Sequence, residues 1–228
     1  MRGMMAEKRT LSPEIGWRKQ DWAYAQVRDW IISGELAPGT RIDQEELAGR
    51  IGISRIPLRE ALARLIAEGF LQGAAHRRVV VTSLSLIDAR DVYCGREALE
   101  SALAGAAAQN AASASEELGE VARILDKTEL LLETGDAEEF RNLDRTFHEG
   151  IYQIANMPKS FGSARSLYAM SERYVRLYLS DSARIAASYA EHVKIYQAVK
   201  AGDAASAAGL TCSHVATGLS LLEVRLAA

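Results

Sequence analysis

The chain has 228 residues, of which 25% are charged and 48% hydrophobic, and its formal net charge is −3. This length leaves room for two modest domains, and no signal peptide or transmembrane stretch appears, so we expect a cytoplasmic protein. Two cysteines, Cys94 and Cys212, are too few for a disulfide framework, and we interpret them as small buried thiols.

The polar segment 1–16 is expected to form a flexible tail. A first helix follows, and a turn signal at Pro38-Gly39 comes after it. The apolar residues of this helix recur at helical spacing and predict a core-facing stripe: Ala23, Val27, Trp30 and Ile31.

Two short helices joined by a tight turn are predicted next. Asp43-Gln44-Glu45-Glu46 reads as a capping box that opens the first, and Gly52 ends it. Ser54 is expected to cap the second helix, where Pro57 is tolerated in the first turn because no intrahelical N–H is needed there. Its buried face is predicted at Leu58, Ala61, Leu62 and Leu65.

Arg55 and Arg59 lie four residues apart on the opposite face of that second helix, with Ile56 beside them. An arginine pair at this spacing is often only a solvated helix face. A short helix, a glycine-containing turn and a helix that begins with arginines together form a helix-turn-helix, however. Two guanidinium groups at such a helix start suit guanine edges and phosphates in a DNA major groove.

A two-stranded wing is predicted after Gly69, from Phe70-Leu71 and Val79-Val80-Val81. Its tip contains three basic or titratable residues that could reach a minor groove: His76, Arg77 and Arg78.

Residues 24–71 resemble the winged helix-turn-helix of GntR-type bacterial transcriptional regulators. The matching pieces, in order, are Ile32-Ser33-Gly34-Glu35-Leu36-Ala37-Pro38-Gly39, Glu46-Leu47-Ala48, Ser54-Arg55-Ile56-Pro57-Leu58-Arg59-Glu60-Ala61-Leu62 and Glu68-Gly69. The resemblance implies that Ser54, Arg55 and Arg59 contact operator bases or phosphates. Related wings usually place a glycine at about Arg78, and this chain departs from that pattern.

Residues 84–228 are predicted to form an all-helical antiparallel bundle, so the chain as a whole is mainly α, with the DNA-binding domain at 17–83. About six helices are expected, near 85–112, 114–134, 136–156, 158–182, 188–201 and 203–226, with capping serines or aspartates at Ser85, Ser113, Asp136 and Ser188. The alanine-rich run 102–112 favours a close helix approach, either in the bundle core or at a dimer interface.

Asp144 and His148 lie one turn apart on one face of the third of these helices, roughly 6 Å between Cβ atoms. We expect His192 and His214 on the inner faces of two other helices. One such histidine is more often a satisfied core residue than a ligand. Three of them with an aspartate predict a divalent metal site, because facing helices commonly hold metals this way.

From Asp88 onward the chain resembles the FCD effector-binding domain of the FadR branch of GntR regulators, and six helices look more like its VanR-type subgroup. The matching residues are Arg96-Glu97-Ala98-Leu99-Glu100, Asp144, Phe147-His148, Asn156, Glu191-His192, Ile195, Ala198, Gly202-Asp203 and His214. The resemblance implies that Asp144, His148, His192 and His214 hold a divalent ion of the Zn, Ni or Mn type.

A metal held by three imidazoles and one carboxylate keeps open positions that suit the oxygens of a small organic acid. Arg96 could pair with the carboxylate of such an acid, or equally with Glu100 four residues later. Arg173 and Asn156 are further effector-binding candidates, although Arg173 could instead face solvent.

We therefore expect a metabolite-responsive DNA-binding regulator, a repressor that acts as a homodimer on double-stranded operator DNA, with no membrane partner and in the bacterial cytoplasm near the nucleoid. The alternative is a metal-dependent hydrolase that uses the same Asp and three His residues to activate water. It lacks a further histidine or carboxylate with an arguable place as general acid or base. A constitutive architectural protein would leave the buried polar cluster without a purpose.

Overall fold

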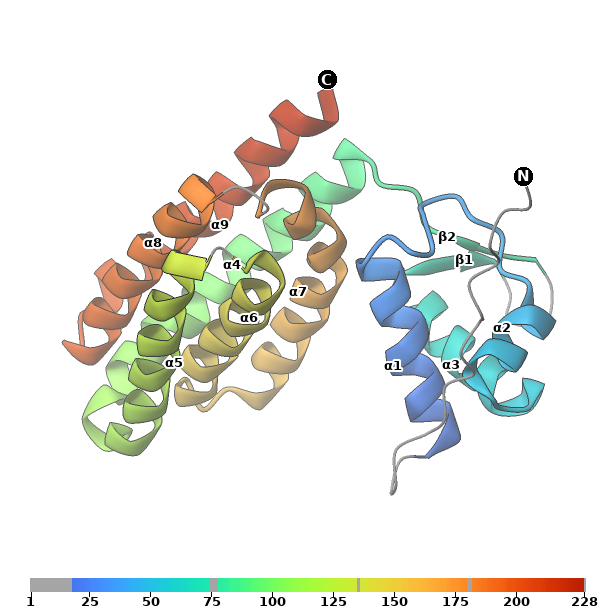
Figure 1. Cartoon of the computed structure of the whole chain (residues 1–228). Coiled ribbons are helices and arrows are strands. Elements are labelled where there is room, and N and C mark those ends of the chain that lie inside the picture. The colour runs from blue at the N-terminus through green and yellow to red at the C-terminus, as the bar shows by residue number, and fades with distance from the viewer. Residues whose placement is uncertain (1–17, 74–77, 135, 180–181, 228) are drawn as a thin grey trace. The chain divides into compact units, whose positions relative to one another are not determined.

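The computed structural model describes residues 18–73, 78–134, 136–179 and 182–227, which form two compact units, Met1–Leu84 and Ser85–Ala228 (Figure 1). The predicted tail 1–16 and the wing-tip residues His76 and Arg77 lie outside the described residues.

The first unit contains three helices and a two-stranded sheet: α1 (Lys19–Ile32), α2 (Gln44–Ile51), α3 (Arg55–Ala67), β1 (Leu71–Gly73) and β2 (Val79–Val81). The predicted stripe of α1 packs against the predicted apolar face of α3. Both sets of side chains are buried, and together they form a large part of the core of the unit: Ala23, Val27, Trp30, Ile31, Leu58, Ala61, Leu62 and Leu65. The helix-turn-helix is therefore held rigidly from one side.

The connection between α2 and α3 follows the predicted chemistry with one exception. The Asp43 carboxylate caps α2 by accepting hydrogen bonds from the amides of Glu45 and Glu46. Gly52 ends α2 at φ 76°, a left-handed conformation that glycine adopts without steric cost. Ser54 occupies the N-cap position of α3, but its side chain makes no capping hydrogen bond, which corrects the prediction.

The wing is an antiparallel pair in which Gly73 faces Val79 and Leu71 faces Val81. Arg41 adds a β-bridge to Val80, which fixes the backbone of the segment before α2 against the wing. Gly73 has φ 113°, and a side chain there would collide with the Arg78 carbonyl oxygen. The backbones of Gly73 on β1 and of Arg78 before β2 therefore come so close together that the position on β1 must be a glycine.

The second unit is a bundle of six α-helices among the described residues: α4 (Leu86–Asn110), α5 (Ser115–Thr134), α6 (Ala137–Ile154), α7 (Pro158–Tyr178), α8 (Ser182–Lys200) and α9 (Ala204–Ala227). Ser85 and Asp136 cap α4 and α6 as predicted. Two other predicted caps were wrong. Ser113 lies in a 3₁₀ turn (Ala111–Ser113), and Ser188 is buried inside α8, which begins six residues earlier than expected.

Helix α4 is the centre of the bundle and packs against α6, α7, α8 and α9 (Figure 1). It runs antiparallel to α9, because Arg90 near its start pairs with Glu223 while Gly105 near its end meets Ala204. A Cβ at Gly105 would lie 3.3 Å from the Ala204 carbonyl oxygen. The alanine-rich run therefore serves close packing inside the bundle, the first of its two predicted uses.

Cys94 and Cys212 are exposed, so their interpretation as buried thiols was wrong. Apolar periodicity does not fix the depth of a single small residue. Among the described helices, none is both long enough and apolar enough to span a membrane.

Candidate functional site

Four potential metal ligands converge in the centre of the bundle. Asp144 and His148 come from α6, His192 from α8 and His214 from α9. One donor atom from each residue can be chosen such that all four lie within 4.8 Å of one another. Two donors bound to one ion at about 2.1 Å can be no more than about 4.2 Å apart, so a small contraction suffices.

The cluster is almost fully enclosed. Asp144, His148 and His192 are 5%, 2% and 1% exposed, and the His214 side chain is 9% exposed. The Nε2 atoms of His148 and His192 are buried without a hydrogen-bond partner in the described part of the chain. Buried polar atoms are normally satisfied, so two orphaned nitrogens beside a carboxylate fit the donor set of a divalent ion.

Three other polar atoms of the cluster have hydrogen-bond partners: Asp144 Oδ2, His148 Nδ1 and His214 Nδ1. The Tyr168 hydroxyl donates to Asp144 Oδ2. His148 Nδ1 lies 3.1 Å from the Tyr152 hydroxyl, and His214 Nδ1 lies 2.6 Å from Glu191 Oε2. The His192 ring stacks on Phe147 with centroids 4.4 Å apart. Its Nε2 lies 3.3 Å from Asp144 Oδ1 but makes no hydrogen bond to it.

Burial dominates the electrostatics of these groups. It lowers the pKa of His148 and of His192 well below the usual value, and the neighbouring histidines lower both further. Burial also raises the pKa of Asp144, against the opposing influence of His214 and the Tyr168 hydrogen bond. His148 and His192 are therefore neutral imidazoles at physiological pH, which is the form that binds metals.

Two arginine–glutamate pairs stand behind the cluster. Arg96 Nε donates to Glu100 Oε1 at 2.7 Å, and both side chains are buried. Arg184 makes two bonds to Glu191, of 2.8 and 2.9 Å. Burial raises the pKa of Glu191, but the hydrogen bonds from His214 and Arg184 outweigh it and bring that pKa down to about 2.

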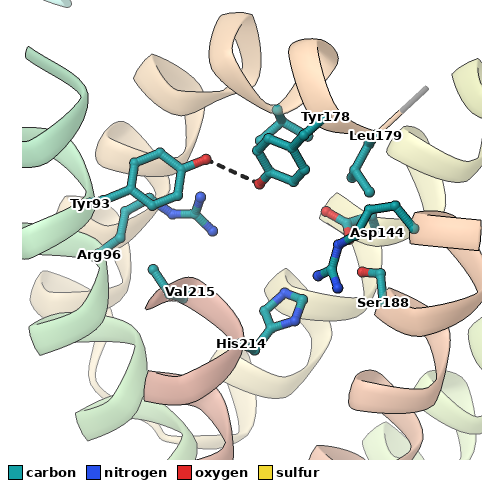
Figure 2. A pocket seen from close by; sticks show the side chains of 10 residues that line it. Tyr93, Arg96, Asp144, Tyr178, Leu179, Ser188, His214 and Val215 are labelled. Atoms are coloured by element: carbon teal, nitrogen blue, oxygen red, sulfur yellow. Dashed lines mark hydrogen bonds between the residues drawn. The ribbon is translucent and has the colours of Figure 1, made fainter. Parts of the chain in front are cut away.

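A small cavity of about 10 Å³ lies beside the cluster. Figure 2 shows Asp144 and His214 facing it together with Arg96 and with Tyr93 and Tyr178, whose hydroxyls are hydrogen-bonded to each other. Arg184 and Ser188 of α8 also line it. A volume near 10 Å³ corresponds to roughly one water molecule, so an organic acid requires these side chains to move apart.

The three predicted effector-binding residues have different surroundings. Arg96 lines the cavity and also forms the Glu100 pair that was its alternative interpretation. Arg173 is buried rather than solvent-facing, and it pairs with Asp88 at 2.7 Å instead of lining this cavity. Asn156 is exposed just beyond the end of α6, with φ 55°, so its position suits helix termination rather than ligand contact.

Several residues of the site were missed by sequence reasoning: Tyr93, Tyr152, Tyr168, Tyr178, Arg184, Ser188 and Glu191. A partial signal existed for two of them. Tyr152 follows His148 by one turn, and Arg184 precedes Glu191 by two turns. The other contacts join different helices and leave no trace in local spacing.

The first unit presents a second candidate site at the start of α3. The Arg55 side chain is 61% exposed and Ile56 is 72% exposed, while Ser54, Arg59 and Arg78 are also exposed. An open groove runs between the start of α2 and the start of α3, lined by Arg41, Ile42, Asp43, Gln44, Glu45, Arg55 and Arg59. Arg41, which sequence reasoning missed, thus joins the two predicted arginines.

Two acidic side chains, Asp43 and Glu45, reduce the positive charge of this groove. The Asp43 carboxylate is already engaged in capping α2, and those bonds lower its pKa. Glu45 lies 3.9 Å from Arg55, with both side chains well exposed. Arg59 Nε donates to Gln44 Oε1 at 3.4 Å, so the two helices present their polar side chains to one surface.

The fold and the two sites define a protein with a winged helix-turn-helix and a helical domain with a buried polar centre. Residues 19–81 match the gntR family of bacterial regulatory proteins, and residues 91–217 match the FCD domain. The chain belongs to the gntR family and carries an FCD effector domain. It is therefore a DNA-binding transcriptional regulator rather than an enzyme.

Individual relatives agree. An HTH-type transcriptional regulator in an unstable DNA locus of Streptomyces ambofaciens is 29% identical over 79% of this chain and 75% of its own length. The HTH-type transcriptional repressor RspR of Escherichia coli is 26% identical over 79% of this chain and 78% of its own. The structure of E. coli McbR/YncC covers 92% of this chain and 99% of its own, with a TM-score of 0.80 and 23% identity, and supports the fold.

The depressed pKa values of His148 and His192 predict an acid sensitivity of the metal-free protein. Below about pH 6.5 the unfolded chain binds protons at both histidines that the folded chain does not, so the free energy of unfolding falls as the pH drops. Circular dichroism during urea unfolding, with chelator, should show this fall between about pH 7 and 5.5.

The double variant His148→Asn/His192→Asn removes both groups and should flatten the slope, whatever its absolute stability. Equal slopes in the variant and the wild-type protein would show that neither histidine titrates differently in the folded state. The range stays above about pH 5.5 because the raised pKa of Asp144 acts in the opposite direction at lower pH.

Proposed function

We propose that the helical domain holds a divalent metal ion at Asp144, His148, His192 and His214 and binds a small organic acid there. The observation that carries this is the convergence of four buried donors, two of whose nitrogens have no hydrogen-bond partner in the described chain. A structural polar core would pair these atoms with one another. An ion of the Zn, Ni or Mn type would leave positions open to carboxylate or hydroxyl oxygens.

We propose that the acid acts by selecting one arrangement of the bundle. The cavity beside the four residues has about 10 Å³ and is closed by Arg96, Tyr178 and Arg184, among others. An acid therefore binds only where these side chains have separated. A ligand that binds one arrangement better than another shifts the equilibrium by that differential affinity, which is the requirement for a switch.

We propose that residues 17–83 bind the operator and that residues 84–228 sense the acid. The protein would act as a homodimeric repressor on a pseudo-palindromic operator. The name of the E. coli relative RspR, a repressor, supports this direction. We propose that binding of the acid lowers the affinity for the operator, so that the protein releases it.

Operator contact is assigned to the exposed start of α3 and its groove. Arg55→Ala and Arg59→Ala should each weaken specific binding by about 1–3 kcal/mol, because each removes a guanidinium that reads a base edge or a phosphate. Arg41→Ala should weaken binding to all sequences alike and reduce its salt dependence, as expected for a phosphate contact. The measurement is fluorescence anisotropy at fixed salt, on DNA selected by the wild-type protein from a random pool.

The matched control is Arg123→Ala, which removes an exposed arginine of α5 paired with Glu120. It should bind DNA like the wild-type protein. Unchanged affinity in Arg55→Ala and Arg59→Ala would remove the assignment of α3 as the recognition helix.

Metal content tests the four-residue site directly. Purified wild-type protein, dialysed against Zn²⁺ or Ni²⁺ and then against buffer, should retain one ion per chain by elemental analysis. His148→Ala and Asp144→Asn should lose it, because each removes one of the four donors. Cys94→Ser/Cys212→Ser is the control, since exposed thiols also bind these metals. Loss of the ion in this control alone would place it at the cysteines.

A thermal-shift screen of small mono- and dicarboxylates, sugar acids and aromatic acids tests the effector. An acid at about 100 times its Kd should stabilise the metal-loaded protein by about 2.7 kcal/mol. The gain should vanish with chelator, and the same acid should lower operator affinity. Stabilisation that survives both chelator and His148→Ala would locate the acid elsewhere.

A further inference from the structure

The proposed metal ligands His148 and His214 each have a hydrogen-bond chain behind them that ends on an arginine. Behind His148 the chain runs through Tyr152 and Glu100 to Arg96. Behind His214 it runs through Glu191 to Arg184. Such chains matter because a neutral imidazole carries one proton, and only the nitrogen without it can bind a metal.

The chain behind His148 has a defined direction. Glu100 is fully buried and accepts from Arg96, and a carboxylate paired with arginine has only acceptor atoms to offer. The Tyr152 hydroxyl, 2.8 Å from Glu100 Oε2, therefore donates its hydrogen to Glu100. Its oxygen is left to accept from His148 Nδ1 at 3.1 Å. The His148 proton accordingly resides on Nδ1, and the lone pair of Nε2 faces the cluster.

The chain behind His214 gives the same result with one residue fewer. Glu191 accepts two bonds from Arg184 and one, of 2.6 Å, from His214 Nδ1. Its oxygens can only accept in this arrangement, so Nδ1 carries the proton. The lone pair of His214 Nε2 is again the one left free.

We propose that Tyr152 with Glu100, and Glu191 on its own, are positioning residues that keep His148 and His214 in the Nδ1–H form, and that Arg96 and Arg184 hold the two carboxylates in place. This inference rests on the proposed metal site. It adds that three residues outside the ligand set decide which nitrogen each histidine offers. Partners of this kind typically change metal affinity 10–100-fold when removed.

The two arginines that end the hydrogen-bond chains also line the cavity. Arg96 is packed over the Tyr168 ring at 4.7 Å, and Tyr168 donates to Asp144, so Arg96 also contacts the residue that orients the carboxylate ligand. Arg96 and Arg184 both line the small cavity. Each is therefore in contact with the cavity on one side and with a residue that orients a metal ligand on the other.

Two conservative substitutions test the chains one at a time. Tyr152→Phe removes only the hydroxyl that accepts from His148. Glu191→Gln replaces one carboxylate oxygen by an NH₂ group, which donates and cannot accept. The side chain can then no longer accept all three hydrogen bonds that His214 and Arg184 now donate to it. The matched control for the first is Tyr196→Phe, which removes a hydroxyl that donates to the Leu118 carbonyl oxygen in the same bundle. The matched control for the second is Glu223→Gln, which alters an exposed ion pair with Arg90.

The first measurement is Zn²⁺ affinity of the full chain by competition with a chromophoric chelator. Tyr152→Phe and Glu191→Gln should each bind Zn²⁺ about 10–100-fold more weakly than the wild-type protein, whereas both controls should match it. Affinities equal to the controls would overturn the proposal.

The second measurement is the ¹⁵N chemical shift of the histidine ring nitrogens in metal-free protein at about pH 8, above the usual imidazole pKa. In the wild-type protein His148 and His214 should both carry the proton on Nδ1. Tyr152→Phe should change the His148 pattern and leave that of His214 unchanged, and Glu191→Gln should do the reverse. A general loss of stability would not give this reciprocal result.

The two measurements separate this inference from the function on which it rests. Wild-type protein that binds no Zn²⁺ would defeat the proposed metal site, whatever its histidine shifts. Wild-type protein that binds Zn²⁺ but carries the proton of His148 or His214 on Nε2 would overturn the proposed chains alone. Tyr152→Phe keeps this test valid if Glu191→Gln does not fold.

Discussion

The burial of one carboxylate and three imidazoles at the centre of a helical bundle constrains the rest of the second unit. Removing polar groups from water costs several kcal/mol unless each finds a partner. Asp144 gains Tyr168, His148 gains Tyr152, and His214 gains Glu191. Each of these partners lies on α6, α7 or α8, so satisfying the cluster fixes how those helices pack around α9 and α4.

The partners of the buried histidines are themselves buried polar groups that need partners, and these series of hydrogen bonds end at Arg96 and Arg184. Glu100 is fully buried and tolerable only because Arg96 and Tyr152 both donate to it. Arg96 in turn donates to Ser171 of α7 and lies over the Tyr168 ring. One residue of the central helix thus contacts the residues that orient both α6 ligands. Buried networks of this type are stable when complete and costly when any one member is removed.

The almost complete lack of empty space beside the four residues bears on how the bundle would act as the proposed switch. The cavity holds roughly the volume of a water molecule, so it offers an organic acid no ready-made pocket. An acid that binds must displace some of the present contacts, and the proposed signal is the resulting change of arrangement. The DNA-binding unit differs in kind. Helix α3 is fixed by an apolar core behind it, and Arg55 at its start is exposed in front.

Local patterns in the sequence were enough for most of the elements and for the four clustered residues Asp144, His148, His192 and His214. Periodicity found the buried faces of α1 and α3, capping residues found the starts of α2, α4 and α6, and the spacing of Asp144 and His148 placed them on one helix face. The errors came where local signals compete. Ser113 and Ser188 looked like caps, but Ser113 belongs to a 3₁₀ turn and Ser188 was absorbed into a longer α8.

The sequence by itself determined which residues could bind DNA and which could hold a metal, because those choices depend on side-chain chemistry and on spacing within one helix. Only the tertiary structure decided what stands behind them. It joined Arg184, Glu191 and His214 across two helices, set Arg41 beside Arg55 and Arg59, and left Asn156 at a helix end. Contacts between helices depend on how whole faces pack together, and a single sequence carries no local record of that packing.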